Sequence, residues 1–92
     1  MRIGLLTVEL YLPQSQSLKH RRGVLRSIRQ RLRNKFNVSV AQEPDNLWQR
    51  ARMYIVGVNS SQRFLESLFS SIEDFLGASR EFEVLDIQRE FI

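Results

Sequence analysis

The stretch that decides the fold is residues 48–77, with the sequence WQRARMYIVGVNSSQRFLESLFSSIEDFLG. Over 48–58 apolar side chains recur at every second position, which is typical of a β-strand with one buried face. The polar cluster Asn59-Ser60-Ser61 can begin a helix, because such side chains accept hydrogen bonds from the first helical N–H groups. Apolar residues then recur at helical spacing until Gly77, which we expect to follow the helix as its stop. The stretch therefore predicts a strand that leads directly into a helix.

The residues before this stretch predict three more elements and a turn. They are strands over 3–12 and 36–41, a helix over 18–34 and a turn over 43–46. Pro13 ends the first strand, because proline has no N–H to donate to a neighbouring strand. Ser15 or Ser17 can cap the helix that follows, whose apolar side chains fall within one stripe.

Residues 82–91 close the chain as the last strand. Its alternation slips at Val84 and Leu85, so we expect a β-bulge or a strand buried on both faces. The complete order is strand, helix, strand, strand, helix, strand. Right-handed crossovers then place both helices on one face of a four-stranded antiparallel sheet. The sequence therefore predicts the α+β class, a ferredoxin-like βαββαβ sandwich, as a single domain over residues 1–92.

The composition excludes several classes of protein. The 92 residues are 42% hydrophobic and 26% charged, which indicates a folded domain rather than a disordered chain. There is no cysteine, so neither a disulfide framework nor a thiolate metal site can form. No stretch approaches the ~20 apolar residues of a spanning helix, and no signal-peptide cleavage site follows the apolar N-terminus. We therefore expect a cytoplasmic protein without a membrane partner.

Positive and negative charges are segregated along the chain. The net charge is +4, but residues 13–42 contain eight basic and no acidic residues, whereas 61–92 contain three basic and seven acidic ones. Five of the basic residues are spaced three or four apart and fall in an arc of about 80° beside the apolar stripe of the first helix. We call them the basic row: Lys19, Arg22, Arg26, Arg29 and Arg33. No acid lies three or four residues from them to pair with, so the pattern favours a surface that follows phosphates.

Two alternatives to a phosphate-binding row stay open. The row can be a solvated helix face, or it can pair with acids of the second helix: Glu66, Glu73 and Asp74. Arg50 and Arg52 on the third strand are the hypothetical second part of a nucleic-acid surface. The helix also has a strip of small or uncharged residues, to which the sequence assigns no role: Gly23, Ser27, Gln30 and Asn34.

The sheet face opposite the helices is expected to be rich in apolar residues. The residues predicted there are Leu5, Tyr11, Tyr54, Val56, Val58, Leu85 and Ile87. This is more apolar surface than a monomer usually exposes, so we expect a second copy of the chain to cover it in a homodimer. The alternative is that these apolar residues are scattered and have no partner.

No catalytic site is expected. His20 is the sole histidine and has no acid near it in the sequence, which argues against a general base. Glycine-rich phosphate loops and clusters of metal ligands are absent from the sequence. We therefore expect a protein that is not an enzyme, with no cofactor, no metal and no small-molecule substrate.

Three blocks of sequence and the chain's ending resemble the YlxP-like family of small bacterial proteins of uncharacterised function. The blocks are residues 17–22, 31–41 and 47–51, and the ending is 85–90. The resemblance implies a ferredoxin-like fold and supplies no catalytic residues. Genes of this family often lie among those for transcription elongation, translation initiation and ribosome maturation, which implies an RNA or ribosome context. The family's motif positions fall here on Lys19, Arg22, Arg33, Asn34, Asn37, Trp48, Gln49 and Arg50, with Trp48 equally able to serve structurally at the sheet edge.

The sequence thus leaves two hypotheses. In the first, the protein is an accessory protein that binds RNA or the ribosome through its basic helix. In the second, it is a homodimeric protein-interaction module whose basic helix docks an acidic protein partner.

Overall fold

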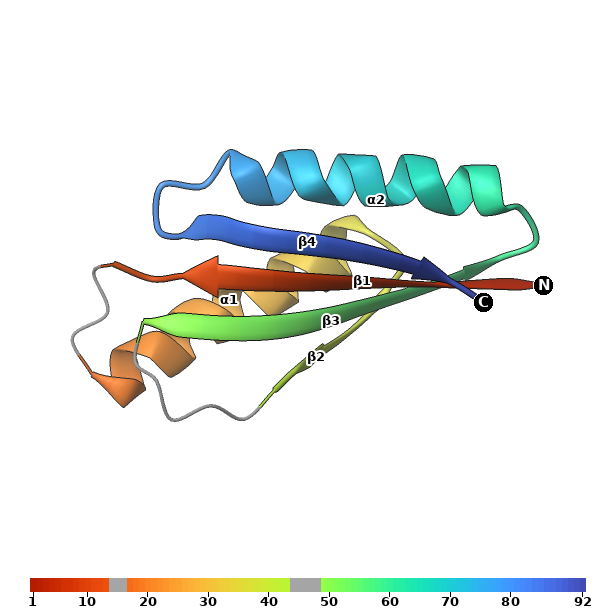
Figure 1. Ribbon diagram of the computed structural model, residues 1–92. Coiled ribbons are helices and arrows are strands. Elements are labelled where there is room, and N and C mark those ends of the chain that lie inside the picture. Colours follow the sequence, from red (N-terminus) through yellow and green to blue (C-terminus); the bar gives the residue numbers. More distant parts are fainter. Residues whose placement is uncertain (14–16, 44–48) are drawn as a thin grey trace.

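The structure is a computed structural model that describes residues 1–13, 17–43 and 49–92 (Figure 1). Its elements are β1 (Arg2–Tyr11), α1 (Leu18–Lys35), β2 (Ser39–Gln42), β3 (Arg50–Asn59), α2 (Gln62–Gly77) and β4 (Glu83–Phe91). The four strands form one antiparallel sheet in the order β2-β3-β1-β4, so β2 and β4 are its edges. The predicted ferredoxin-like arrangement of four strands and two helices is confirmed.

One face of the sheet packs on the helices and forms the core. The buried side chains of β1 alternate strictly and include Leu6, Val8 and Leu10, whose partners on β3 are also buried. Both helices contribute to the same core, α1 with Leu25, Ile28 and Leu32 and α2 with Phe69, Ile72 and Leu76. Burying each of these side chains contributes about 1.5–3 kcal/mol relative to exposure, so this common core fixes both helices on the same sheet face.

A glycine allows the closest contact between α2 and the sheet. A Cβ atom built on Gly4 of β1 would lie 2.8 Å from the ring of Phe69. Phe69 itself is fully buried and stacks on Phe91 of β4, with ring centroids 5.8 Å apart. The absence of a side chain at Gly4 therefore makes room for Phe69, the largest of the fully buried side chains.

Serine caps begin both helices. The Ser17 side chain accepts a hydrogen bond from the backbone N–H of His20 at 3.1 Å, and Ser61 accepts one from Phe64 at 3.3 Å. Both satisfy N–H groups that have no partner within the helix. The expected stop at Gly77 is wrong: Gly77 is the last residue of α2, and Ala78 caps the helix. No glycine among the described residues has the positive φ that would make it a helix stop, so α2 continues through Gly77.

The bulge in β4 is confirmed and determines which side chains face the helices. Glu9 pairs with Asp86 while the next residue, Leu10, pairs with Val84, so Leu85 is the extra residue. Leu85 is 43% exposed, whereas Ile87 pairs with Val8 and packs against the core. We call the sheet face opposite the helices the open face. The expectation that Ile87 lies on the open face is therefore wrong, because the extra residue of the bulge turns the Ile87 side chain toward the helices.

Several expected boundaries move by a few residues. The second strand begins at Ser39 rather than at residue 36, because Phe36 is the C-cap of α1. The third strand is described from Arg50, and Trp48 and most of the turn predicted over 43–46 lie outside the described residues. Among the residues that the structure describes, no helix combines the length and hydrophobicity needed to span a membrane.

Candidate nucleic-acid interface

The basic row lies along one flank of α1, directly beside the buried stripe of that helix. Lys19, Arg22, Arg26 and Arg33 are exposed and Arg29 is half-buried. From Lys19 to Arg33 the helix rises about 21 Å, at about 1.5 Å per residue. The five cations thus follow one flank of a rigid element.

Contacts with the sheet show which way this flank faces. Arg33 donates from Nη2 to the carbonyl oxygen of Val40 in β2, at 3.4 Å. The buried Arg21 donates from Nη2 to the carbonyl oxygen of Arg50 in β3, at 3.0 Å. The basic row therefore runs beside the β2 edge of the sheet, on the side of α1 that faces away from α2.

Four acids of the described residues pair with cations outside the row, among them Glu73 and Glu81. Arg89 binds Glu73 at 2.8 Å, and Arg31, which is outside the row, binds Glu81 at 3.4 Å. Across residues 1–13, 17–43 and 49–92, no member of the row forms an ion pair. The alternative in which the row pairs with Glu66, Glu73 and Asp74 of α2 is therefore not what the structure contains.

The structure does not bring Arg50 and Arg52 to the row. Both side chains belong to the open face, where Arg50 pairs with Tyr11 and Arg52 with Glu9 across the β1–β3 ladder. The Arg52 guanidinium donates to Glu9 Oε1 from Nε at 3.1 Å and from Nη2 at 2.5 Å, and its Nη1 lies 3.5 Å from Glu43 Oε2. Hydrogen bonding to Glu9 is the main cause that raises the pKa of Arg52. Arg52 is thus already bound to two carboxylates.

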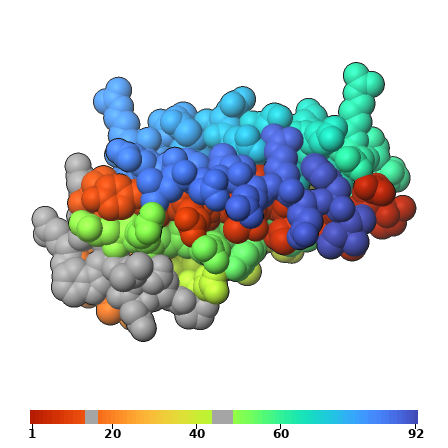
Figure 2. Space-filling view, in the orientation of Figure 1, coloured from red at the N-terminus to blue at the C-terminus, as the bar shows by residue number. Residues whose placement is uncertain are grey.

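On the open face the strands β3, β1 and β4 lie side by side, as the space-filling view shows (Figure 2). Charged and polar groups divide the apolar residues of this face into separate groups. Tyr54 donates its hydroxyl to Glu43 at 2.6 Å, and Glu9 lies between Arg52 and Asp86. At one end of the face an apolar cluster crosses three strands: Ile3, Leu5, Val56, Val58 and Ile92. Tyr11 and Leu85 lie at the other end, so the predicted dimer face is not one continuous apolar surface.

The uncharged strip of α1 borders a hollow that Lys19, the first member of the row, also lines. Gly23 and Ser27 line this hollow of about 490 Å³, together with Glu81 from the loop after α2. Glu81 also lines a larger groove of about 870 Å³ between the C-terminal halves of the two helices. A Cβ atom on Gly23 would meet nothing within 4 Å, so packing does not require glycine there.

The described residues bring together no group of three or more histidine, cysteine, aspartate or glutamate side chains that could hold a metal ion. The exposed His20 takes part in the N-terminal cap of α1 through its backbone N–H. The exposed guanidinium groups of the basic row can bind anions.

Comparison with known proteins agrees with the resemblance read from the sequence. Residues 3–89 match a family model whose description is "Protein of unknown function (DUF503)". The chain is also 34% identical over 82 residues to an uncharacterised protein, YlxP of Bacillus subtilis (strain 168), an alignment that covers 88% of this chain and 89% of that protein. By the extent of both matches, this chain belongs to the DUF503 family of YlxP-like proteins.

Proposed function

We propose that this protein is a non-enzymatic, cytoplasmic accessory protein that binds RNA, alone or in the ribosome, through the basic row of α1. The observation that carries the proposal is the row itself. Its five cations share one helix flank and are exposed or half-buried, and none forms an ion pair with a described carboxylate. Guanidinium groups present several donors in a fixed fork, which suits phosphate oxygens.

The cost of assembling the row also supports a polyanionic partner. Like charges three or four residues apart on a helix destabilise it by about 0.2–0.5 kcal/mol per pair. Two of the five, Lys19 and Arg22, lie near the N-terminus of α1, where the positive end of the helix dipole disfavours cations. A line of phosphates would relieve both effects, because its charge is opposite to that of the row.

The rest of the charge distribution favours one orientation on such a partner. The acids Glu66, Glu73 and Asp74 lie on α2, and Glu83, Asp86 and Glu90 lie on β4 at the opposite edge of the sheet from β2. A polyanion attracts the α1–β2 side and repels the α2–β4 side. This separation of charge would steer the basic row toward RNA during encounter.

The proposal is tested by fluorescence anisotropy with a labelled fragment of ribosomal RNA over a series of salt concentrations. Each phosphate neutralised by a cation releases counterions, so we expect log Kobs to fall linearly with log salt. If all five cations contact phosphates, the slope is roughly −3.5 to −4.5. Absence of binding at physiological salt, or a slope near zero, would contradict the proposal.

The alternative function is a protein-interaction module, a homodimer whose basic row docks an acidic protein. The observation in its favour is the apolar cluster on the open face, where Ile3, Val58 and Ile92 are 39%, 54% and 68% exposed. This candidate ranks second because acids occupy the middle of that face and divide its apolar residues. A salt series without RNA binding would favour it.

A further inference from the structure

Resting on the proposed function, we infer that the RNA bound by the basic row is double-helical and is recognised through its sugar–phosphate backbone. Single-stranded RNA is held by stacking its bases on aromatic side chains, in addition to phosphate contacts. A double helix offers phosphates in fixed positions and keeps its bases stacked on one another. A site for single-stranded RNA therefore needs aromatic rings beside its cations, whereas a site for double-helical RNA does not.

The described residues provide no phenylalanine or tyrosine platform beside the basic row. Phe36 and Phe75 form an edge-to-face pair on the α2 side of α1, with Lys35 Nζ 5.9 and 5.1 Å from their ring centroids. The exposed aromatic ring of α2, Phe64, lies on the other helix. Within the described part of the chain, the ring that α1 offers next to the row is the His20 imidazole, beside Lys19 at the start of the helix, so bases splayed along the rest of the row would find none to stack on.

The open sheet face, where this architecture can stack single-stranded RNA, carries acids instead. Glu9 and Glu43 surround Arg52 there and bind it. Across the ladder, Asp86 pairs with Glu9, and Glu90 pairs with Leu5. The Tyr54 hydroxyl is bound to Glu43. These carboxylates repel a phosphate chain, so the open face does not supply the stacking platform that the row lacks.

The geometry of the row suits a rigid partner. Its cations extend about 21 Å along a single α-helix, which holds them at fixed spacing. A flexible single strand would lose conformational freedom on aligning with this row. Along most of the row it would meet guanidinium planes rather than the aromatic rings whose stacking contributes about 1–3 kcal/mol per base. A-form RNA keeps its phosphates ordered before binding and is recognised mainly by shape and backbone contacts. The duplex therefore loses less freedom for the same charge contacts.

The inference is tested by competition at physiological salt. A labelled perfect RNA duplex is bound to the full chain and displaced by either the unlabelled duplex or an oligouridine with the same number of phosphates. We expect the duplex to compete about tenfold better or more, and duplexes of unrelated sequence to compete equally well.

The outcomes separate this inference from the function on which it rests. If oligouridine competes as well as the duplex or better, RNA binding stands and the duplex inference is overturned. If duplexes of different sequence compete unequally by tenfold or more, backbone recognition is overturned. If neither the labelled duplex nor labelled oligouridine binds the chain at all, the proposed function itself fails.

Discussion

Reversing two charges of the basic row, with Arg22→Glu and Arg26→Glu together, is expected to reduce the affinity for RNA about 100-fold at physiological salt. Each change removes a cation from the phosphate chain and adds a carboxylate that repels it. A 100-fold loss corresponds to about 2.8 kcal/mol, near the lower limit for removing two charged hydrogen bonds of about 1.5–3 kcal/mol each. Both side chains are exposed and outside the core, so the fold should be retained. Fluorescence anisotropy with the labelled duplex measures the change.

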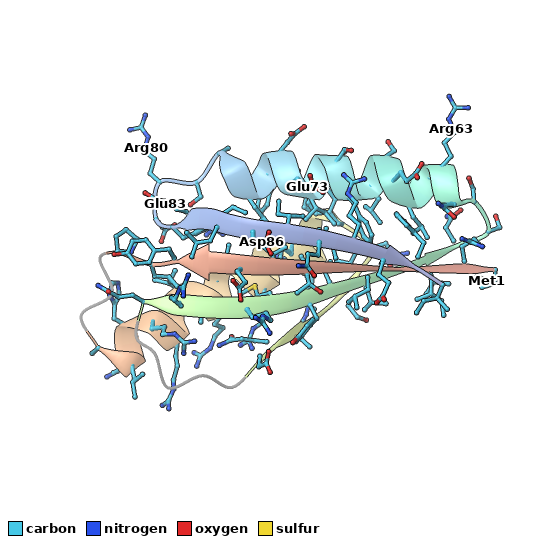
Figure 3. All side chains as sticks on the ribbon, viewed as in Figure 1. Met1, Arg63, Glu73, Arg80, Glu83 and Asp86 are labelled. Atoms are coloured by element: carbon cyan, nitrogen blue, oxygen red, sulfur yellow. The ribbon has the colours of Figure 1, made fainter. Side chains whose placement is uncertain are left out.

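A matched control separates the position of the charges from their number. Arg63→Glu together with Arg80→Glu also replaces two cations by two anions, so both double variants lower the net charge from +4 to 0. Arg63 projects from the start of α2 and Arg80 from the loop after it, both away from the sheet (Figure 3). We expect the affinity of the control for RNA to stay within about threefold of the unmodified protein, because salt screens the interaction between RNA and charges that lie far from the binding site. An equal loss in both variants would show that net charge alone drives binding and would remove the basic row as the site.

Truncation of the central aromatic side chain, Phe69→Ala, is expected to destabilise the protein by about 3–5 kcal/mol. The ring is fully buried against Gly4, stacks on Phe91, and has the Arg89 guanidinium 5.9 Å from its centroid. A domain of this size has a total stability of about 5–14 kcal/mol, so the loss is a large part of the whole. Urea unfolding followed by circular dichroism measures this loss. The urea concentration at the midpoint should fall, while the slope of the free energy of unfolding against urea concentration should stay unchanged.

The control for this prediction is on the same helix. Phe64 is 55% exposed, so Phe64→Ala removes an aromatic ring of the same size without leaving a cavity in the core. We expect it to change the free energy of unfolding by less than about 0.5 kcal/mol. Similar losses for the two variants would contradict the assignment of Phe69, rather than Phe64, to the core.

The fold could be predicted because each element has its own local signal. The strand period over 48–58, the serine cap and the helical period that follows are all properties of neighbouring residues. The errors arise where the signal is not local. The prediction for Ile87 fails because the slip at Val84 and Leu85 is compatible with a bulge or with a strand buried on both faces. Only the pairing with β1 shows that Leu85 is the extra residue and that Ile87 faces the helices. Gly77 belongs to α2 because backbone conformation, rather than residue type, decides where a helix ends.

Part of the candidate site could likewise be predicted from the sequence, and part could not. The basic row is visible in the sequence, because its members are three or four residues apart and one helix aligns them. The binding of Arg52 by Glu9 is not visible in the sequence, because it depends on the register between β1 and β3, whose two residues are distant in the chain. The same register places Ile3 beside Val58, and backbone hydrogen bonds place Ile92 on the other side of Ile3, which adds two residues to the apolar end of the open face.

The central claim is that RNA binds along α1, beside the β2 edge, and not on the open sheet face. The most direct measurement is a titration of the ¹⁵N-labelled protein with an RNA duplex, followed by two-dimensional NMR. Binding along the row predicts the largest shift changes in the backbone amides of residues 19–33 and of β2. Amides of β4 and the first half of α2 should change little. Changes concentrated in β1, β3 and β4, around Glu9 and Arg52, would place RNA on the open face and contradict the account.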